Sequence, residues 1–234
     1  MPRTSPMPIS RRLLVTAGAL LGTGIGRAAA QSYGQRVAVT GDDGKAVANS
    51  MLPGEITGQI PALRGVTYVG PRDAGATLYE FFDFNCPYCR KAAADVVALH
   101  DSDAELRIGL VHNPILSPQS AQAAKVMLAV QRRLGSDAAW RFYQTLLGKP
   151  GRIDGPGALA AAAAMGIPQA EVEEIADSEE VRAALKSQMR MAADLGLYAT
   201  PSYVLGNSGI LGHPGARAMA KMIASVRRCD RLAC

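Results

Sequence analysis

The sequence predicts an α/β fold with a helical insertion and a short N-terminal extension. Two apolar stretches with the pattern of buried strands, residues 76–84 and 105–112, enclose a segment with helical spacing. A long helical block follows them, and a hairpin and a helix close the chain. The strand–helix–strand unit predicts a parallel pair with a right-handed crossover. Because the closing hairpin is antiparallel, we expect a mixed sheet.

The composition is that of an ordinary globular protein. The chain has 234 residues, of which 48% are hydrophobic and 19% charged, and this argues against a collagen, a coiled coil or a disordered chain. Its net charge of +5 owes most to four arginines in residues 1–30, and residues 31–234 hold 21 basic and 20 acidic groups. We therefore expect no nucleic-acid partner.

Residues 1–30 have the pattern of a secretory signal peptide. Arg11 and Arg12 precede a charge-free stretch, residues 13–26, which is shorter than the ~20 residues of a membrane-spanning helix. The small residues 28–30 match a cleavage site. Residues 10–14 (SRRLL) resemble a twin-arginine export motif, and an ordinary secretory signal fits as well. The sequence thus predicts removal of the signal and localisation in the periplasm.

Residues 31–65 are predicted to form the N-terminal extension. The segments 36–40 and 45–48 flank the turn sequence GDDG and predict a β-hairpin. Glycines and prolines from 53 to 61 then separate this hairpin from the next regular element.

Residues 66–228 are predicted to form the main domain. A short strand at 66–69 precedes the buried strand 76–84, and a helix from Pro87 to His100 leads to the strand 105–112. The helical insertion covers about 114–196, and its expected helices are 117–134, 137–147 and 157–196, the last with breaks at 166–168 and near 177–178. The strand 202–205, its hairpin partner 210–212 and a helix over 214–228 complete the domain.

Cys86 and Cys89 enclose the motif CPYC between a predicted strand and a predicted helix. This position makes a C-x-x-C motif typical of thiol redox chemistry. The reacting species is the thiolate, and the amide ends and dipole of a helix N-terminus lower the pKa of a cysteine placed there. Cys86 is therefore the expected nucleophile, and Cys89, one turn further on, the resolving thiol. A structural disulfide and half of a zinc site are the alternatives.

The segment FFDFNCPYC, the later TPSYV from residue 200, and HNPIL at 112–116 resemble the DsbA-like thiol–disulfide oxidoreductases. These are exported bacterial members of the thioredoxin superfamily, and the resemblance covers about residues 64–228. It implies a thioredoxin fold and thiol–disulfide exchange without an organic cofactor or a metal. It also implies reduced or misoxidised exported proteins as substrates and a membrane redox partner.

The resemblance assigns roles to further residues. Pro201 would be a cis proline against the disulfide, and Thr200 would offer backbone hydrogen bonds to an extended substrate. By their position between the two cysteines alone, Pro87 and Tyr88 would line the active-site surface. Glu80, six residues before Cys86, matches the buried acid of the family. A desolvated carboxyl there has a raised pKa and can exchange a proton with the resolving thiol.

Cys229 and Cys234 lie outside the family motif. They cannot face each other on an intact helix, since five residues rotate by about 140°. A bridge requires the helix to end near Cys229, and we predict a structural disulfide in the tail 229–234, with a second redox pair or a metal contact as alternatives.

The predicted function is a monomeric dithiol oxidase that donates its disulfide to exported proteins. A disulfide isomerase or reductase of the same fold, kept reduced, is the alternative. The family's isomerases dimerise through a substantial N-terminal domain, and residues 31–65 are short for one. A copper-handling protein with two thiol pairs is a further alternative, because soft thiolates select Cu(I).

Overall fold

The computed structural model describes Met1 and residues 34–234. The predicted signal peptide therefore lies outside the described residues, apart from Met1. Within the described part of the chain, no helix combines the length and the apolar character needed to cross a bilayer.

A mixed six-stranded sheet runs through the centre of the described domain, in the order β1-β6-β5-β3-β4-β2. The central strand β3 pairs parallel with β4 and antiparallel with β5, which confirms the predicted parallel unit and the antiparallel ending. The strands are β1 (Ala48–Met51), β2 (Thr67–Val69), β3 (Ala76–Phe82), β4 (Leu106–His112), β5 (Ser202–Leu205) and β6 (Ser208–Leu211).

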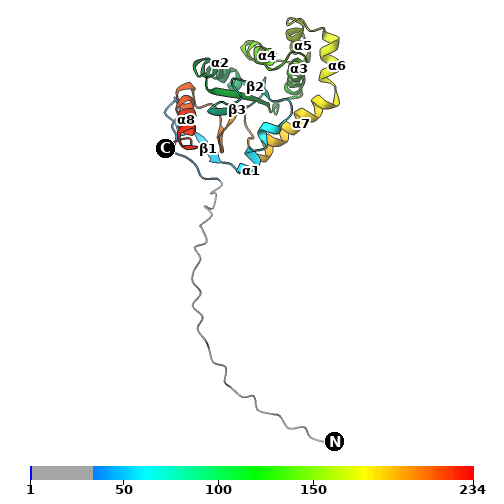
Figure 1. Ribbon diagram of the computed structural model, residues 1–234. Helices are drawn as coiled ribbons and strands as arrows, with labels where there is room; N and C mark the ends of the chain where they lie inside the picture. Colours follow the sequence, from blue (N-terminus) through cyan, green and yellow to red (C-terminus); the bar gives the residue numbers. More distant parts are fainter. Residues whose placement is uncertain (2–33) are drawn as a thin grey trace. The chain divides into compact units, whose positions relative to one another are not determined.

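The helices fall into two groups. Five consecutive helices form the insertion between β4 and β5, and Figure 1 shows most of this insertion at one end of the domain, with α8 at the other end. The helices are α1 (Gly54–Thr57), α2 (Pro87–Ser102), α3 (Pro118–Leu134), α4 (Ser136–Gly148), α5 (Gly155–Ala163), α6 (Gln169–Ala176), α7 (Glu179–Asp194) and α8 (Ala216–Cys229), with a 3-10 turn, η1, at Ile60–Ala62.

Local caps explain where the insertion helices begin. The side chains of Ser117, Asp154 and Ser178 accept hydrogen bonds from backbone amides in the first turns of α3, α5 and α7. Gly135, with φ 87°, separates α3 from α4 at the predicted break. The structure is thus a thioredoxin-like fold with a helical insertion, as predicted.

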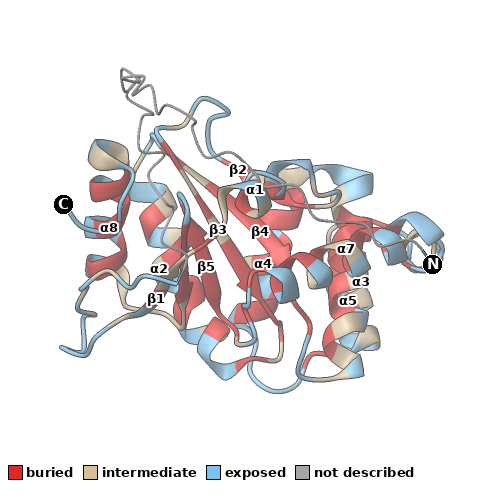
Figure 2. Ribbon diagram, turned by 90° about the horizontal axis from the view of Figure 1, so that it is seen from below, coloured by how far each residue is buried: buried red, intermediate tan, exposed pale blue. Residues whose placement is uncertain are grey.

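The two faces of the sheet carry separate apolar clusters. Leu78, Phe82 and Phe84 from β3 and the residues after it pack with α2, α4 and α8, whereas Phe81 packs on the opposite face with Met191 of α7. Figure 2 shows that the central strands are mostly buried. Glu80 shares the face of Leu78 and Phe82, in agreement with the strand alternation.

The N-terminal extension folds back on itself over the segments predicted to form a hairpin. Thr40 and Ala46 make an antiparallel bridge, and the backbone N–H of Val47 donates to the C=O of Val39, so the two arms are joined irregularly. Its second arm continues into β1, which pairs along its whole length with β6 and forms one edge of the sheet. The Asn49 side chain binds the backbone N–H and C=O of Val37 and thus adds to the backbone hydrogen bonds that join the two arms. The extension therefore completes the main sheet.

Candidate active site

The two cysteines of the CPYC motif lie where β3 gives way to α2. Cys86 is the residue before the first helical turn, and Pro87 occupies the first position of α2, where the missing N–H costs nothing. Both are free thiols in this structure. Cys86 is 3% exposed and Cys89 is 0% exposed, so the motif has an outer and an inner sulfur.

The surroundings of Cys86 lower its pKa to about 5. The largest cause is the hydrogen bond from the Cys89 thiol, and burial opposes it. The side chain of Thr200 and the backbone amides of Cys89 and Tyr88 contribute further to the low pKa. The amides of the helix N-terminus thus help to hold the thiolate, as the sequence predicts, but the inner thiol contributes more than they do.

Cys89 has the opposite character. Burial raises the pKa of its thiol strongly, and the neighbouring Cys86 and Glu80 raise it further. One sulfur is therefore poised as a nucleophile at neutral pH, while the other stays protonated until a base removes its proton. This asymmetry is what the predicted roles of Cys86 and Cys89 require.

The segment before β5 faces Cys86 from the other side. The peptide bond between Thr200 and Pro201 is cis, and Pro201 is buried. The thiol of Cys86 donates a hydrogen bond to the carbonyl oxygen of Thr200 at 3.0 Å. The hydroxyl of Thr200 is buried and has no hydrogen-bond partner of its own, so it is available to donate to a thiolate at Cys86.

Glu80 lies on β3 as a fully buried carboxyl. Burial raises its pKa to about 8, although the Tyr143 hydroxyl, which donates to Glu80 Oε2 at 2.8 Å, acts in the other direction. The coupling of this pKa to Cys86, and of the Cys89 pKa to Glu80, indicates that the acid lies near both sulfurs. A carboxyl with this pKa can exchange protons with a thiol near neutral pH.

Two polar side chains fix the loop before Cys86. Asp83 accepts hydrogen bonds from the backbone amides of Asn85 and Leu116 and thus has a structural role. Asn85 bonds to both the N–H and the C=O of Ile153. These bonds tie the loop to the helical insertion, so the insertion helps to hold Cys86 in place.

The surface around the motif combines exposed aromatic side chains with a hollow of mixed character. Tyr88 is 67% exposed, and Tyr198, two residues before Thr200, is 77% exposed. A hollow of about 300 Å³ next to the start of α2 is lined by Pro87 and Leu116 and by polar groups that include Arg90 and Arg152. An extended peptide could therefore meet aromatic side chains near Cys86 and charged groups in the hollow.

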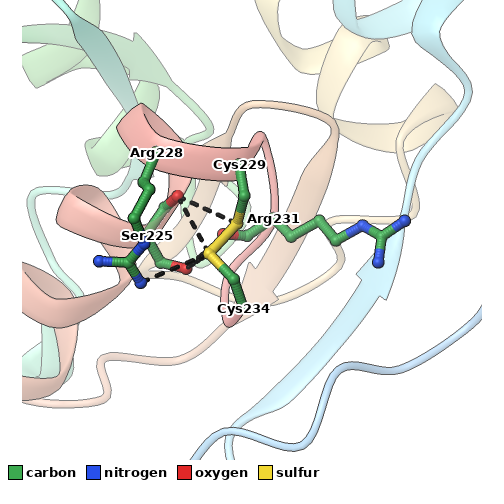
Figure 3. The surroundings of a disulfide bond; sticks show 5 residues. All are labelled: Ser225, Arg228, Cys229, Arg231 and Cys234. Atoms are coloured by element: carbon green, nitrogen blue, oxygen red, sulfur yellow. Dashed lines mark hydrogen bonds between the residues drawn. A yellow bond between two sulfur atoms is a disulfide. The ribbon is translucent and has the colours of Figure 1, made fainter.

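The second pair of cysteines forms a disulfide at the end of α8 (Figure 3). The helix ends at Cys229, and Asp230 adopts a left-handed conformation that turns the tail back. The hydroxyl of Ser225 donates to the sulfur of Cys234 at 3.1 Å. Leu232, inside the closed ring, is 2% exposed and packs into the main core.

In the described residues, no three His, Cys, Asp or Glu side chains gather closely enough to hold an ion together.

The DSBA-like thioredoxin domain family matches residues 77–224, a span that includes Glu80, both active-site cysteines and Pro201. The chain belongs to this family. Its members are thiol–disulfide oxidoreductases, and this is the enzyme class of the chain.

Solved structures agree with this assignment. A thioredoxin-like oxidoreductase from Silicibacter pomeroyi DSS-3 is 30% identical, with a TM-score of 0.66, and the match covers 71% of this chain and 94% of that one. The thiol-disulfide exchange protein alpha-DsbA2 from Wolbachia pipientis is 20% identical, with a TM-score of 0.67 and coverage of 74% and 94%, and supports the fold alone.

One curated relative is a much longer protein, an ion antiporter. The Na(+)/H(+) antiporter NhaA of Herminiimonas arsenicoxydans is 25% identical over 214 residues, which is 91% of this chain but 32% of that protein. Because the chain spans only a third of this relative's length, the named activity is not carried over.

Several residues at the site escaped the sequence analysis. Tyr143 comes from the insertion, 63 positions after Glu80, and nothing in its local sequence marks it as a partner of a buried acid. Tyr203 and His213 are hydrogen-bonded to each other, and His213 also binds Asp95. The available signal was weak: Tyr203 lies two residues after Pro201, on the strand that follows the family's proline.

Proposed function

We propose that this protein is a dithiol oxidase of the periplasm that donates the Cys86–Cys89 disulfide to reduced exported proteins. The low pKa of Cys86 carries the proposal. A stabilised thiolate stabilises the dithiol form, so the disulfide form gains oxidising power. Lowering a thiol pKa by one unit corresponds to about 1.4 kcal/mol, or about 30 mV for this two-electron couple.

The exchange proceeds in two displacements. A substrate thiolate attacks Cys86 Sγ, the bond between the two enzyme sulfurs breaks, and Cys89 leaves and takes a proton from Glu80. A second substrate thiolate then attacks the substrate sulfur of the mixed disulfide, and Cys86 leaves as a thiolate. Two electrons pass from the substrate dithiol to the enzyme, and neither step requires an organic cofactor or a metal.

The surface around Cys86 supports an extended peptide as the substrate. Tyr88 is exposed beside the nucleophile, and Pro87 lines the adjoining hollow. We expect Thr200 and Pro201 to meet the substrate backbone on the opposite side. A membrane redox partner would accept the electrons by the reverse displacement and restore the disulfide, with the enzyme acting as a monomer.

The reduction potential tests the direction of exchange. The purified protein is equilibrated with glutathione buffers, and the fraction of Cys86–Cys89 disulfide is measured by mass after alkylation. We expect a potential above about −180 mV, between those of an isomerase and a strong oxidant. A potential near about −270 mV would indicate a reductase. Stoichiometric copper retained on the thiols after purification from the periplasm would instead favour the metal-handling alternative.

A further inference from the structure

Glu80 must exchange protons with solvent although its carboxyl is fully buried. In the proposed oxidation it gives a proton to Cys89. When the disulfide is restored, it must act as a base, and its pKa of about 8 in the dithiol form means that it starts protonated at neutral pH. The proton therefore has to leave the site before Cys89 can be deprotonated.

On the side of Glu80 that faces the insertion, buried side chains leave no path for a proton to solvent. Oε2 accepts its hydrogen bond from Tyr143, which is 0% exposed and stacks on Trp140 with 5.3 Å between the ring centroids. The other oxygen, Oε1, is buried and has no hydrogen-bond partner. Oε1 is therefore free to exchange a proton with another neighbour.

Tyr203 is the cross-strand neighbour of Glu80. The register of β3 and β5 places the two residues opposite each other, so that their side chains lie on the same face of the sheet. Tyr203 is 0% exposed and packs in the same apolar cluster as Leu78 and Phe82. Its phenol is therefore the polar group that β5 contributes to the face of the buried acid. The hydroxyl makes no hydrogen bond to Oε1 in this arrangement, so a side-chain movement or a bridging water has to complete the last step.

Two hydrogen bonds lead from Tyr203 to the surface. The Tyr203 hydroxyl lies 2.9 Å from His213 Nδ1, and His213 Nε2 lies 2.9 Å from Asp95 Oδ2. The exposed fraction rises along this chain, from 0% for Tyr203 to 13% for the His213 side chain and 41% for that of Asp95. The chain thus connects the buried face of the sheet with solvent beside α2.

The hydrogen bonds fix the resting proton positions. Asp95 can only accept as a carboxylate, so Nε2–H of neutral His213 donates to it, and the Tyr203 hydroxyl donates to Nδ1. When His213 takes up a second proton, Nδ1–H donates to the phenol oxygen. The phenol hydrogen is then released and can turn towards the acid.

We propose that Asp95, His213 and Tyr203 form the route by which protons pass between solvent and the Glu80 carboxyl. This inference rests on the proposed function, because it serves the proton exchange of that reaction. Inward transfer begins with a proton from solvent on His213. Tyr203 gives its phenol proton to Glu80 Oε1 and takes the proton on Nδ1, which leaves neutral His213 and a protonated acid. Outward transfer is the reverse.

The other titratable groups around Glu80 do not replace this route. Tyr143 from α4 and the two cysteines at the start of α2 are themselves buried. On β4, His112 lies beside Phe82, and burial lowers its pKa to about 3, so it stays neutral in the working range. His213 is faced by Asp95 from α2 and Tyr203 from β5, and these two groups make up the rest of the route.

The test measures closure of a mixed disulfide in the reduced full chain. The protein is mixed with oxidised glutathione, and acid quenching with mass spectrometry gives the rate of glutathione attachment at Cys86 and the rate of its release by Cys89. In Tyr203→Phe and His213→Gln we expect release to slow about tenfold at neutral pH, with attachment unchanged. The solvent deuterium isotope effect on release should increase in both variants.

The control is His100→Gln, which changes a partly buried histidine that packs on Trp140 in the last turn of α2. It should release glutathione at the wild-type rate.

Two outcomes would overturn the proposal. One is release at the wild-type rate in both Tyr203→Phe and His213→Gln, and the other is an equal loss in the rates of attachment and release. If those two variants do not fold, Asp95→Asn serves as the test. We expect it to release glutathione more slowly and with a shifted pH dependence. An unchanged pH dependence of release would contradict the proposal. Wild-type protein that never forms or resolves the adduct would overturn the proposed function itself.

Discussion

The two cysteine pairs of this protein lie at opposite ends of β5 and have opposite surroundings. Cys86 faces Thr200, just before the strand, whereas Gly206, just after it, packs against Val226 and Asp230 beside the tail disulfide. Around Cys86 and Cys89, burial and hydrogen bonds separate the pKa values of the two thiols. Cys229 and Cys234 instead form a disulfide that closes a short loop, and the Ser225 hydroxyl donates a hydrogen bond to Cys234. The difference shows that the surroundings, and not the residue type, assign the chemistry.

The largest expected difference between the pairs is in activity. Cys86→Ser should abolish disulfide transfer to a reduced substrate protein, because it removes the attacked sulfur. The double variant Cys229→Ser, Cys234→Ser should transfer disulfides at the wild-type rate. Oxidative refolding of a reduced substrate measures both. Activity that survives Cys86→Ser would indicate a binding or chaperone role and would contradict the assignment.

The second difference concerns the buried acid, which the tail pair lacks. Glu80→Gln keeps the size of the side chain but cannot exchange a proton, so exchange near neutral pH should slow by about tenfold or more. Stopped-flow rates across the pH range measure the effect, with unfolding curves to check the fold. An unchanged rate would remove Glu80 from the mechanism.

A third difference appears in the pH dependence of stability. The ordinary thiol pKa of 9.0 falls to about 5 at Cys86 in the folded dithiol protein. This stabilisation is complete above about pH 9 and is lost as the pH falls towards 5, because the unfolded chain then binds more protons. The free energy of unfolding of the reduced protein, relative to the oxidised one, should therefore rise between about pH 5 and 8.

Denaturant titrations of both redox forms measure this difference. The slope should not exceed about 1.4 kcal/mol per pH unit. Reduced Cys86→Ser is the matched control and should lose the slope. A reduced protein whose relative stability falls over this range would contradict the low pKa.

The smallest expected effect belongs to the tail. Removal of the Cys229–Cys234 bridge should lower the free energy of unfolding by about 2 kcal/mol, since the closed loop is short. The single replacements and the double variant should lower the free energy of unfolding by the same amount within error. A loss of exchange activity in the double variant would assign this pair to the catalytic cycle.

The fold could be predicted closely because local signals and tertiary contacts agree in it. The helix from Pro87, the break at Gly135 and the buried strand over 76–82 each have a local physical cause. The pairing of the extension with the main sheet was harder to predict, because the partner of β1 is β6, about 160 residues further along the chain. A turn signal such as GDDG does not say which strand will accept the ladder bonds.

The candidate site could be predicted only where the motif is local in sequence. The spacing of the motif predicts Cys86 and Cys89, and the resemblance to the family assigns Glu80, six residues before Cys86. Tyr143, Tyr203 and His213 come from three other elements, and only folding brings them to the acid. The sequence analysis also placed the main stabilisation of the Cys86 thiolate in the helix amides. The structure gives the larger share to Cys89 and thus to packing inside the motif.

The most direct measurement is the pKa of Cys86, followed through thiolate absorbance in the reduced protein, with Cys86→Ser as the blank. We expect a midpoint near pH 5, with Cys89 still protonated at neutral pH. A midpoint near 9.0, the value of an ordinary thiol, would mean that the surroundings of Cys86 do not stabilise its thiolate.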